Sequence, residues 1–206
     1  MGLLTEQDHQ TLKTATQKAE AKTSGEVYTV VAQRSDNYAY IPLLMIAFFS
    51  LSTPLPLLYL TDFGADTIWM VQVGVFVALS LLLQLAGSHP ILVPSTVKAR
   101  RVYRSAVEQF LAHNVHTTTE RTGILLYVSL AEKRVELVAD SGINDKIEPS
   151  EWQGIVDNLT AAIAKDDLAQ GLADAIQRCG ENLTQHFPAD TPNKNELSDH
   201  IIEIPN

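Results

Sequence analysis

The stretch AYIPLLMIAFFSLSTPLPLLYL, residues 39–60, contains no charged side chain. The six residues TDFGAD separate it from a second uncharged stretch, which begins TIWMVQVGVFVALSLLLQLAG and extends over residues 67–89. A helix needs about 20 apolar residues to cross the ~30 Å hydrocarbon layer of a membrane. The pair therefore predicts a two-helix transmembrane hairpin inserted into an otherwise soluble chain. The alternatives are a buried helical hairpin in a soluble protein and an interfacial re-entrant pair.

The two stretches predict helices of different regularity. The first contains three prolines, which remove backbone donors and should bend the helix: Pro42, Pro54 and Pro56. The second has Trp69 near one end, where an aromatic ring lies at the level of lipid headgroups. Only Gln72 and Gln84 are strongly polar within it, so it is the more regular of the two predicted helices.

Basic residues around the hairpin predict its orientation. Arg34 precedes it, and four basic residues follow it: Lys98, Arg100, Arg101 and Arg104. The connecting loop carries only Asp62 and Asp66 as charged residues. Because basic residues favour the cytoplasmic side of a membrane, we expect both flanks and both termini to lie in the cytoplasm.

The formal net charge of −9 is unevenly distributed over the 206 residues. Residues 98–134 hold seven basic and three acidic side chains, whereas residues 135–206 hold four basic and fourteen acidic ones. We expect the four basic residues after the hairpin to contact anionic lipid headgroups of the bilayer, where each contributes ~1 kcal/mol. The acidic carboxy-terminal third argues against nucleic acid as a partner. The single cysteine, Cys179, allows no internal disulfide and is predicted to pack in the core.

Outside the hairpin, residues 1–35 and 97–187 predict one α/β domain with a mixed sheet, followed by a polar tail at residues 188–206. HIIEI, residues 200–204 of this tail, is either a short docking strand or a membrane-proximal anchor. The segment DSGINDKI is predicted to be a loop. Four helices are predicted: an opening helix that ends at Lys22, one from Ser95 to about His116, one that begins at Pro149 and carries Trp152, and one over residues 166–187. Three strands are predicted, at residues 26–33, 123–130 and 135–140. A turn at Glu132 and Lys133 joins the last two strands.

Several of these segments together are distinctive: TSGEVYTVVAQRS, RTGILLYVSLAEKRVELVADSGINDKI, the helix of Trp152, AIQRCGENL and NELSDHIIEI. Taken together they resemble the TPM domain family over residues 1–35 and 97–206. The resemblance implies an α/β sandwich, here with the transmembrane hairpin inserted after the first strand, as in short multi-pass proteins of the bacterial inner membrane. It also implies either assembly or repair functions, or acid phosphatase activity and divalent-cation binding by carboxylates, since family members differ in these properties.

The segment DSGIND carries the best candidate metal ligands. Asp140, Asn144 and Asp145 offer side-chain oxygens, which hard cations such as calcium or magnesium prefer. Glu26, at the start of the first predicted strand, would join them if the strands are neighbours. The alternative is a glycine-containing turn in which Asp140 caps backbone amides.

His113 and His116 lie three residues apart on one predicted helix and could bind zinc if a third ligand came from elsewhere. The alternative is a polar helix end, where an imidazole meets terminal carbonyls. No P-loop, no G-x-S-x-G elbow and no Cys-x5-Arg pocket occurs in the sequence, so we predict no catalytic residue.

These observations predict a membrane-anchored TPM-like protein that acts as an interaction or assembly/repair module for a membrane complex. Its expected partners are the lipid bilayer and a membrane protein that the sequence does not identify. The alternative function is that of a divalent-metal-dependent phosphatase that uses Asp140 and Asp145. A small-molecule or ion conduit is disfavoured, because two helices cannot line a pore without oligomerising.

Overall fold

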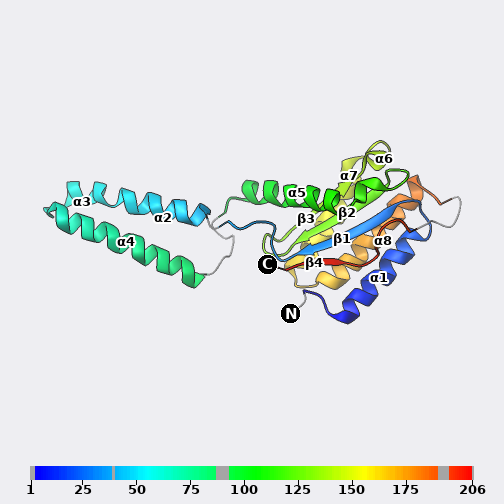
Figure 1. Cartoon of the computed structure of the whole chain (residues 1–206), viewed down its shortest axis with the longest axis horizontal. Coiled ribbons are helices and arrows are strands. Elements are labelled where there is room, and N and C mark those ends of the chain that lie inside the picture. The colour runs from blue at the N-terminus through cyan, green and yellow to red at the C-terminus, as the bar shows by residue number, and fades with distance from the viewer. Residues whose placement is uncertain (1–2, 39, 87–92, 190–194, 206) are drawn as a thin grey trace. The chain divides into compact units, whose positions relative to one another are not determined.

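A computed structural model of the chain describes residues 3–38, 40–86, 93–189 and 195–205. The chain divides into two compact units, of which one consists of residues 1–36 and 98–206 and the other of residues 37–97. The first unit is an α/β domain, and the second is a helical hairpin (Figure 1).

A four-stranded sheet forms the centre of the α/β domain, with the strand order β3-β2-β1-β4. Strand β1 (Glu26–Ala32) pairs in parallel with β2 (Gly123–Ser129) on one side and with β4 (Ile202–Ile204) on the other. Strand β3 (Arg134–Ala139) pairs antiparallel with β2. Every residue of β1 and β2 is buried, as expected of two apolar strands in the middle of a sheet. The predicted mixed sheet is thus confirmed, and the last three residues of HIIEI form the edge strand β4.

Helices cover both faces of this sheet (Figure 1). On one face lie α1 (Glu6–Glu20), α7 (Pro149–Ala164) and α8 (Leu168–His186), whose apolar stripes share a core with inward residues of β1 and β2. On the other face lies α5 (Ser95–Ala112) alone, followed by the short helix η2 (Val115–Thr117). The structure therefore has one helical layer on each side of the sheet, as the sequence predicts.

Helix ends follow local sequence signals. The Thr5 side chain accepts from the Asp8 backbone N–H, and the Asp8 carboxylate accepts from Thr5, so the two residues form a capping box before α1. Helix α5 ends at Ala112, earlier than predicted, because Asn114 adopts a left-handed conformation with φ of 57°. Trp152 and Cys179 are buried in the core as predicted, and burial raises the pKa of the Cys179 thiol to about 12.

Glu203, the middle residue of β4, holds the amino-terminal segment against the sheet edge. Its carboxylate accepts hydrogen bonds from the backbone N–H groups of Leu3, at 2.9 Å, and Leu4, at 3.0 Å. It also lies 2.9 Å from Nε2 of His9. Partial burial raises the pKa of Glu203, but these donors outweigh it and hold the pKa below its ordinary value. The two ends of the chain are thus fastened to each other through one side chain.

The hairpin consists of α2 (Tyr40–Ser52), α3 (Pro54–Leu60) and α4 (Ala65–Ala86). The predicted first helix, residues 39–60, is interrupted after Ser52, where Pro54 lacks the N–H that would continue the hydrogen-bond ladder. The predicted second helix, residues 67–89, begins two residues earlier, at Ala65, and residues 39 and 87–89 lie outside the described residues. Helices α2 and α3 both pack against α4, and the Ser50 hydroxyl donates to the Gln72 carbonyl at 3.2 Å.

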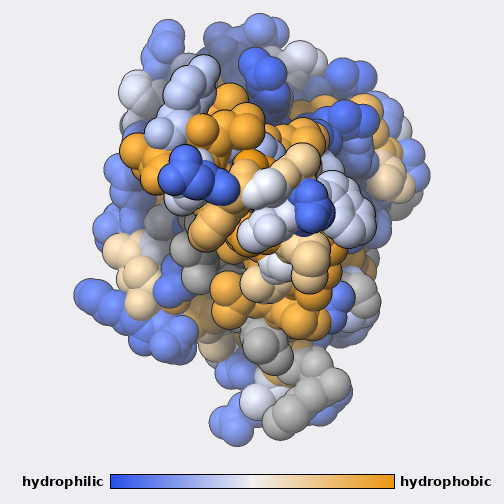
Figure 2. Space-filling model, turned by 90° about the vertical axis from the view of Figure 1, so that its left-hand side faces the viewer, coloured by the Kyte–Doolittle hydropathy of each residue, from blue (hydrophilic) through white to orange (hydrophobic). Residues whose placement is uncertain are grey.

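Large apolar side chains of the hairpin point into solvent. Phe48 is 66% exposed, Trp69 is 64% exposed and Leu60 is 80% exposed. Figure 2 shows apolar residues gathered on the face that it presents. By length and composition, Tyr40–Leu60 and Ala65–Gln84 are each sufficient to cross a membrane.

Candidate functional site

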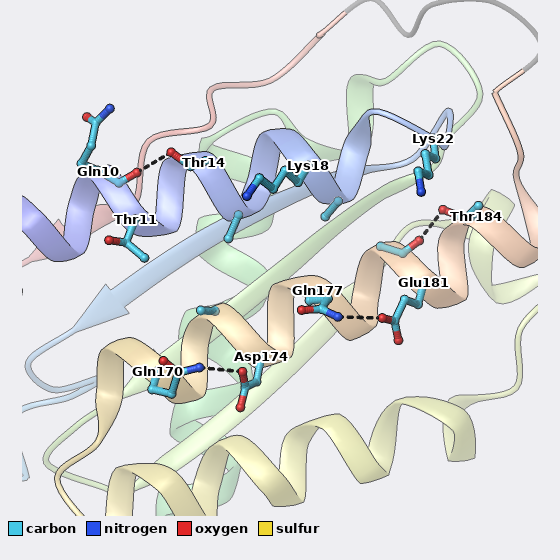
Figure 3. Close-up of a pocket in the computed structure, with 14 residues that line it drawn as sticks. Gln10, Thr11, Thr14, Lys18, Lys22, Gln170, Asp174, Gln177, Glu181 and Thr184 are labelled. Atoms are coloured by element: carbon cyan, nitrogen blue, oxygen red, sulfur yellow. Dashed lines mark hydrogen bonds between the residues drawn. The ribbon is translucent and has the colours of Figure 1, made fainter.

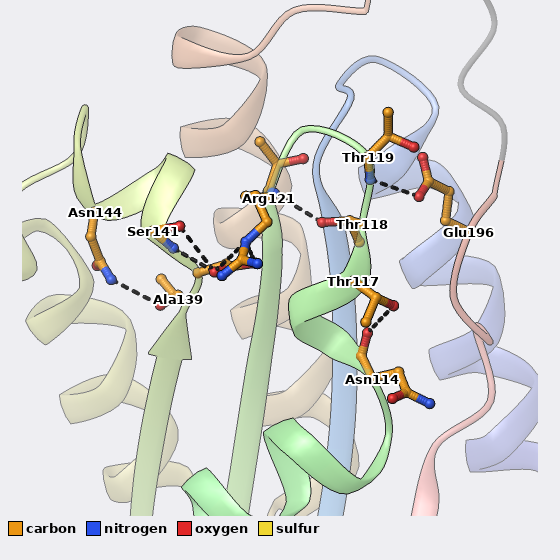
Figure 4. A network of polar contacts seen from close by, with 11 residues as sticks. Asn114, Thr117, Thr118, Thr119, Arg121, Ala139, Ser141, Asn144 and Glu196 are labelled. Carbon is orange, nitrogen blue, oxygen red and sulfur yellow. Dashed lines mark hydrogen bonds and ion pairs between the residues drawn. The ribbon is translucent and has the colours of Figure 1, made fainter.

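Asp140 follows the last residue of β3 and is almost completely buried. Its carboxylate accepts from the Ser141 backbone N–H at 2.6 Å, which caps the short helix α6 (Ser141–Asn144). The Nε of Arg121 lies 3.0 Å from the other carboxylate oxygen (Figure 4). The charge of Asp140 is therefore balanced by a guanidinium and a helix amino terminus.

The prediction of a loop at DSGIND is wrong, because residues 141–144 form α6. Asp140 supplies the cap that starts this helix, and Gly142 allows it to approach the preceding segment. A Cβ atom on Gly142 would lie only 2.6 Å from the carbonyl oxygen of Glu120. The Asn144 amide donates to the Ala139 carbonyl at 2.9 Å (Figure 4), and Asp145 is exposed at the end of the helix. Asp140 and Asn144 thus both bond to the backbone of this turn.

The sheet brings Glu26 to the same end as Asp140. Glu26 pairs in register with Gly123 on β2, and the Gly123 carbonyl accepts from the Asp140 N–H at 3.0 Å. Glu26 is 1% exposed, and one of its carboxylate oxygens lies 3.4 Å from the donating backbone N of Glu196. Strands β1 and β3 are not direct neighbours, because β2 lies between them, so Glu26 and Asp140 share only the same end of the sheet.

The structure does not gather these oxygens around one point. Within residues 3–38, 40–86, 93–189 and 195–205, no group of three or more His, Cys, Asp or Glu side chains is placed to hold a metal ion. The site of Asp140, Asn144, Asp145 and Glu26 for calcium or magnesium stays a prediction.

A buried carboxylate that the sequence did not single out lies beside Glu26. Glu20, at the end of α1, is 7% exposed and accepts from the Val27 backbone N–H at 2.8 Å. Burial raises the pKa of Glu20 to about 8, and the nearby carboxylates of Glu26 and Asp199 add to the rise. Glu20 therefore holds a proton at neutral pH. The sequence offers little signal for this, because α1 is polar on most of its surface and Asp199 is distant in the chain.

The two candidate zinc ligands, His113 and His116, both contact other side chains. Both ring nitrogens of His113 have protein partners, since Nδ1 lies 3.1 Å from the Tyr28 hydroxyl and Nε2 lies 3.1 Å from the Gln109 side-chain oxygen. The ring of His116 packs against Phe110. His113 has no ring nitrogen left for a metal ion, and its partners are side chains instead of the terminal carbonyls of the alternative interpretation.

Comparison with known proteins identifies a family whose model matches part of this α/β domain. Residues 91–182 match the family model of the TPM domain. This part of the chain is therefore similar to the TPM domain. A comparison with curated protein sequences found no significant match.

A solved structure shares the fold of this chain. The NMR structure of the BA42 protein from the psychrophilic bacterium Bizionia argentinensis superposes with a TM-score of 0.61. The alignment covers 98% of this chain and 95% of BA42, at 18% sequence identity. At this identity the similarity shows a common fold.

A cluster of hydroxyl groups lies at the opposite end of β2 in the α/β domain. The Ser35 hydroxyl donates to Ser129 at 2.7 Å and lies 3.1 Å from the Tyr127 hydroxyl. Ser129 in turn donates to the buried carboxylate of Glu132, which also accepts from the Ser35 backbone N–H. Ser105 on α5 completes the cluster at 2.9 Å from Tyr127. These groups bond to one another, and together they fasten the chain just before the hairpin to β2 and α5.

The four predicted membrane-surface residues all lie on α5. Arg101 is bound to Asp36, with 3.0 Å between Nε and the carboxylate. Arg104 forms an exposed pair with Glu108 one helical turn later, at 2.9 Å. The side chains of Lys98 and Arg100 make no hydrogen bond or ion pair with the part of the chain that the structure describes.

An open groove of about 780 Å³ runs between α1 and α8 (Figure 3). Its floor contains small side chains, and its polar rim residues on α8 bond along their own helix. The Gln170 amide donates to Asp174 at 2.9 Å, and the Gln177 amide donates to Glu181 at 2.9 Å. Because these side chains pair with each other instead of converging, the groove offers no catalytic arrangement.

Proposed function

We propose that this TPM-like protein is anchored in the bacterial inner membrane by its hairpin, with both termini in the cytoplasm. We propose further that it acts as an interaction or assembly module for a membrane complex. The observation that carries the proposal is the solvent-facing apolar surface of α2, α3 and α4. Contiguous apolar surface of this kind marks a membrane or protein contact, because exposure to water is unfavourable.

The arrangement of polar groups supports a binding role over a catalytic one. Asp140 is neutralised by Arg121, and the hydroxyl groups around Tyr127 bond to one another. A catalytic site needs a nucleophile or base within reach of a substrate and donors aimed at developing charge. The polar groups of these two clusters bond among themselves, which suits a scaffold that presents surfaces to a partner.

The test is affinity purification from detergent-solubilised membranes with the full chain as bait. The control bait carries an unrelated two-helix transmembrane hairpin in place of residues 39–93, so that membrane anchoring is kept. A third bait lacks residues 39–93 altogether. We expect the full chain to sediment with membranes after alkaline carbonate extraction and to co-purify a membrane protein in constant ratio.

The control baits decide which part contacts the partner. Recovery by the full chain and by the bait with the unrelated hairpin assigns the contact to the α/β domain. Recovery by the full chain alone assigns it to the hairpin. If none of the three baits recovers a specific protein, or if the full chain stays in the supernatant without detergent, the proposal is wrong.

A second candidate function is divalent-metal-dependent hydrolysis of phosphomonoesters. It is favoured by the sheet register, which brings Glu26 and Asp140 to either side of Gly123. Under this hypothesis the double variant D140N/D145N lowers turnover in the presence of magnesium or calcium at least about tenfold, while asparagine at position 140 keeps the helix cap. D157N, on the exposed face of α7, is the control. Turnover that is absent, or unchanged in the double variant, leaves only the interaction role.

A further inference from the structure

Helix α5 has one face in the core and one in solvent. Val102, Ala106 and Phe110 are buried against the sheet. The opposite side chains recur at intervals of three and four residues and form a single exposed stripe, here called the α5 face: Arg100, Tyr103, Arg104, Glu108 and Leu111. Tyr103 and Leu111 are more than half exposed, although both are large and apolar. One face of α5 therefore packs on the sheet, and its exposed face carries both charged and large apolar side chains.

The structure separates the basic residues of α5 into two groups. Arg101 points toward Asp36, the last residue of the domain before the hairpin, and its ion pair is partly buried. Arg104 is 70% exposed in its pair with Glu108, and exposed pairs of this kind are weak and easily exchanged. Arg100 makes no ion pair within the described residues. Arg100 and Arg104 are thus the exposed cations of α5, whereas Lys98, which also has no ion pair within the described residues, is half-buried and lies outside the α5 face.

The charge of α5 contrasts with that of the whole chain. Residues 95–112 hold four basic residues and one acidic residue, whereas the chain carries a net charge of −9. A negatively charged surface would repel most of the domain and attract this helix. Tyr103 and Leu111 between and beside the cations add the aromatic and aliphatic groups that enter the headgroup region of a bilayer.

The length of the connection keeps α5 near the membrane. Eight residues, 87–94, join α4 to α5, and eight residues span at most about 28 Å even when fully extended. A membrane-spanning α4 therefore holds the start of α5 within that distance of the lipid surface. The short connection between α4 and α5 thus keeps lipid at a high effective concentration near α5.

We propose that the α5 face lies on an anionic lipid surface, with Arg100 and Arg104 at the headgroup phosphates and Tyr103 and Leu111 in the headgroup region. This inference rests on the proposed membrane insertion of the hairpin. Lipid contact through α5 fixes which side of the domain faces the membrane, and it leaves the acidic helices α7 and α8 available to partners in the cytoplasm.

The experiment uses the full chain with L111C labelled by an environment-sensitive fluorophore. The native Cys179 is completely buried and does not compete for the label. The protein is reconstituted into vesicles of phosphatidylcholine with phosphatidylglycerol, or of phosphatidylcholine alone, each with a spin-labelled lipid as quencher. We expect strong quenching in the anionic vesicles and weak quenching in the neutral ones.

Charge reversal tests the role of the two arginines. In the anionic vesicles, R100E/R104E should lower the ratio of lipid-contacting to free label at least about tenfold. The matched control K165E/R178E makes the same change in net charge at exposed positions on the other side of the sheet, and it should leave the quenching unchanged. Equal quenching in R100E/R104E and in the labelled protein that keeps both arginines would overturn the proposal.

The remaining outcomes separate this inference from the proposed membrane anchoring. Carbonate extraction of the same vesicles reports whether the hairpin is inserted. If the protein is extracted, the proposed anchoring fails. If it stays in the vesicles but Leu111 is not quenched, the anchoring stands and the lipid contact of α5 is overturned. A label that is shielded in native membranes but exposed in anionic vesicles also overturns it, in favour of a protein partner.

Discussion

Replacing Gly123 by alanine should destabilise the α/β domain by roughly 3 kcal/mol, although the change adds only one methyl group. A Cβ atom at this position would lie 2.2 Å from the carbonyl oxygen of Val115 and 2.8 Å from its Cγ1. Val115 is completely buried in η2, so it has no free space into which it can move. Either η2 or β2 must shift, and β2 pairs with both β1 and β3.

Gly154 provides the matched control for this prediction. It lies on the exposed side of α7, and a Cβ atom there would meet nothing within 4 Å. Alanine at position 154 should therefore stabilise the protein by up to about 1 kcal/mol, through the higher helix propensity of alanine. Urea denaturation of the full chain in mild detergent, followed by near-ultraviolet circular dichroism, measures both variants. Equal midpoints for G123A and the unmodified protein would show that the contact with η2 adapts at little cost.

The sequence predicts the layers of the fold because each layer depends on local patterns. Alternating or continuous apolar residues identify β1 and β2, and a turn at Lys133, which has φ of 49°, joins β2 to β3 as expected. Uncharged length alone identifies the two apolar stretches of the hairpin. The position of β4 could not be predicted in this way, since a three-residue strand carries little periodicity. Its place beside β1 depends on a long-range backbone pairing with Val30–Ala32, and Glu203 adds contacts with the equally distant Leu3 and Leu4.

The candidate site was less predictable, because side-chain partners come from distant segments. The sequence identified Asp140 and Glu26 as residues at strand ends, and the register brings them to the same end of the sheet. It gave no indication that Arg121 would neutralise Asp140, since the strands β2 and β3 both lie between the two residues in the chain. It also gave no indication that Glu20 would lie near Asp199, at the opposite end of the chain.

Glu20 leads to the second large prediction, in which the stability of the domain decreases as the pH rises. The pKa of Glu20 is about 8 in the folded protein, against an ordinary value of 4.5. Between these two pH values the folded state keeps a proton that the unfolded state has lost, so folding becomes less favourable with each step upward in pH. The decrease begins near pH 4.5 and levels off above pH 8, where Glu20 is ionised in both states.

The variant E20Q should remove this pH dependence and stabilise the protein at pH 7 by an amount on the order of 3 kcal/mol, since each pH unit above the unfolded pKa costs about 1.4 kcal/mol. The glutamine oxygen still accepts from the Val27 N–H, and its amide can donate to the carboxylates of Glu26 and Asp199. E181Q is the control, because Glu181 is exposed on α8 and its bond from Gln177 needs only an acceptor. Denaturation of the three proteins at pH 5, 7 and 9 distinguishes the possibilities. If E20Q keeps the slope of the unmodified protein, the proton that causes the pH dependence does not reside on Glu20, and the prediction is wrong.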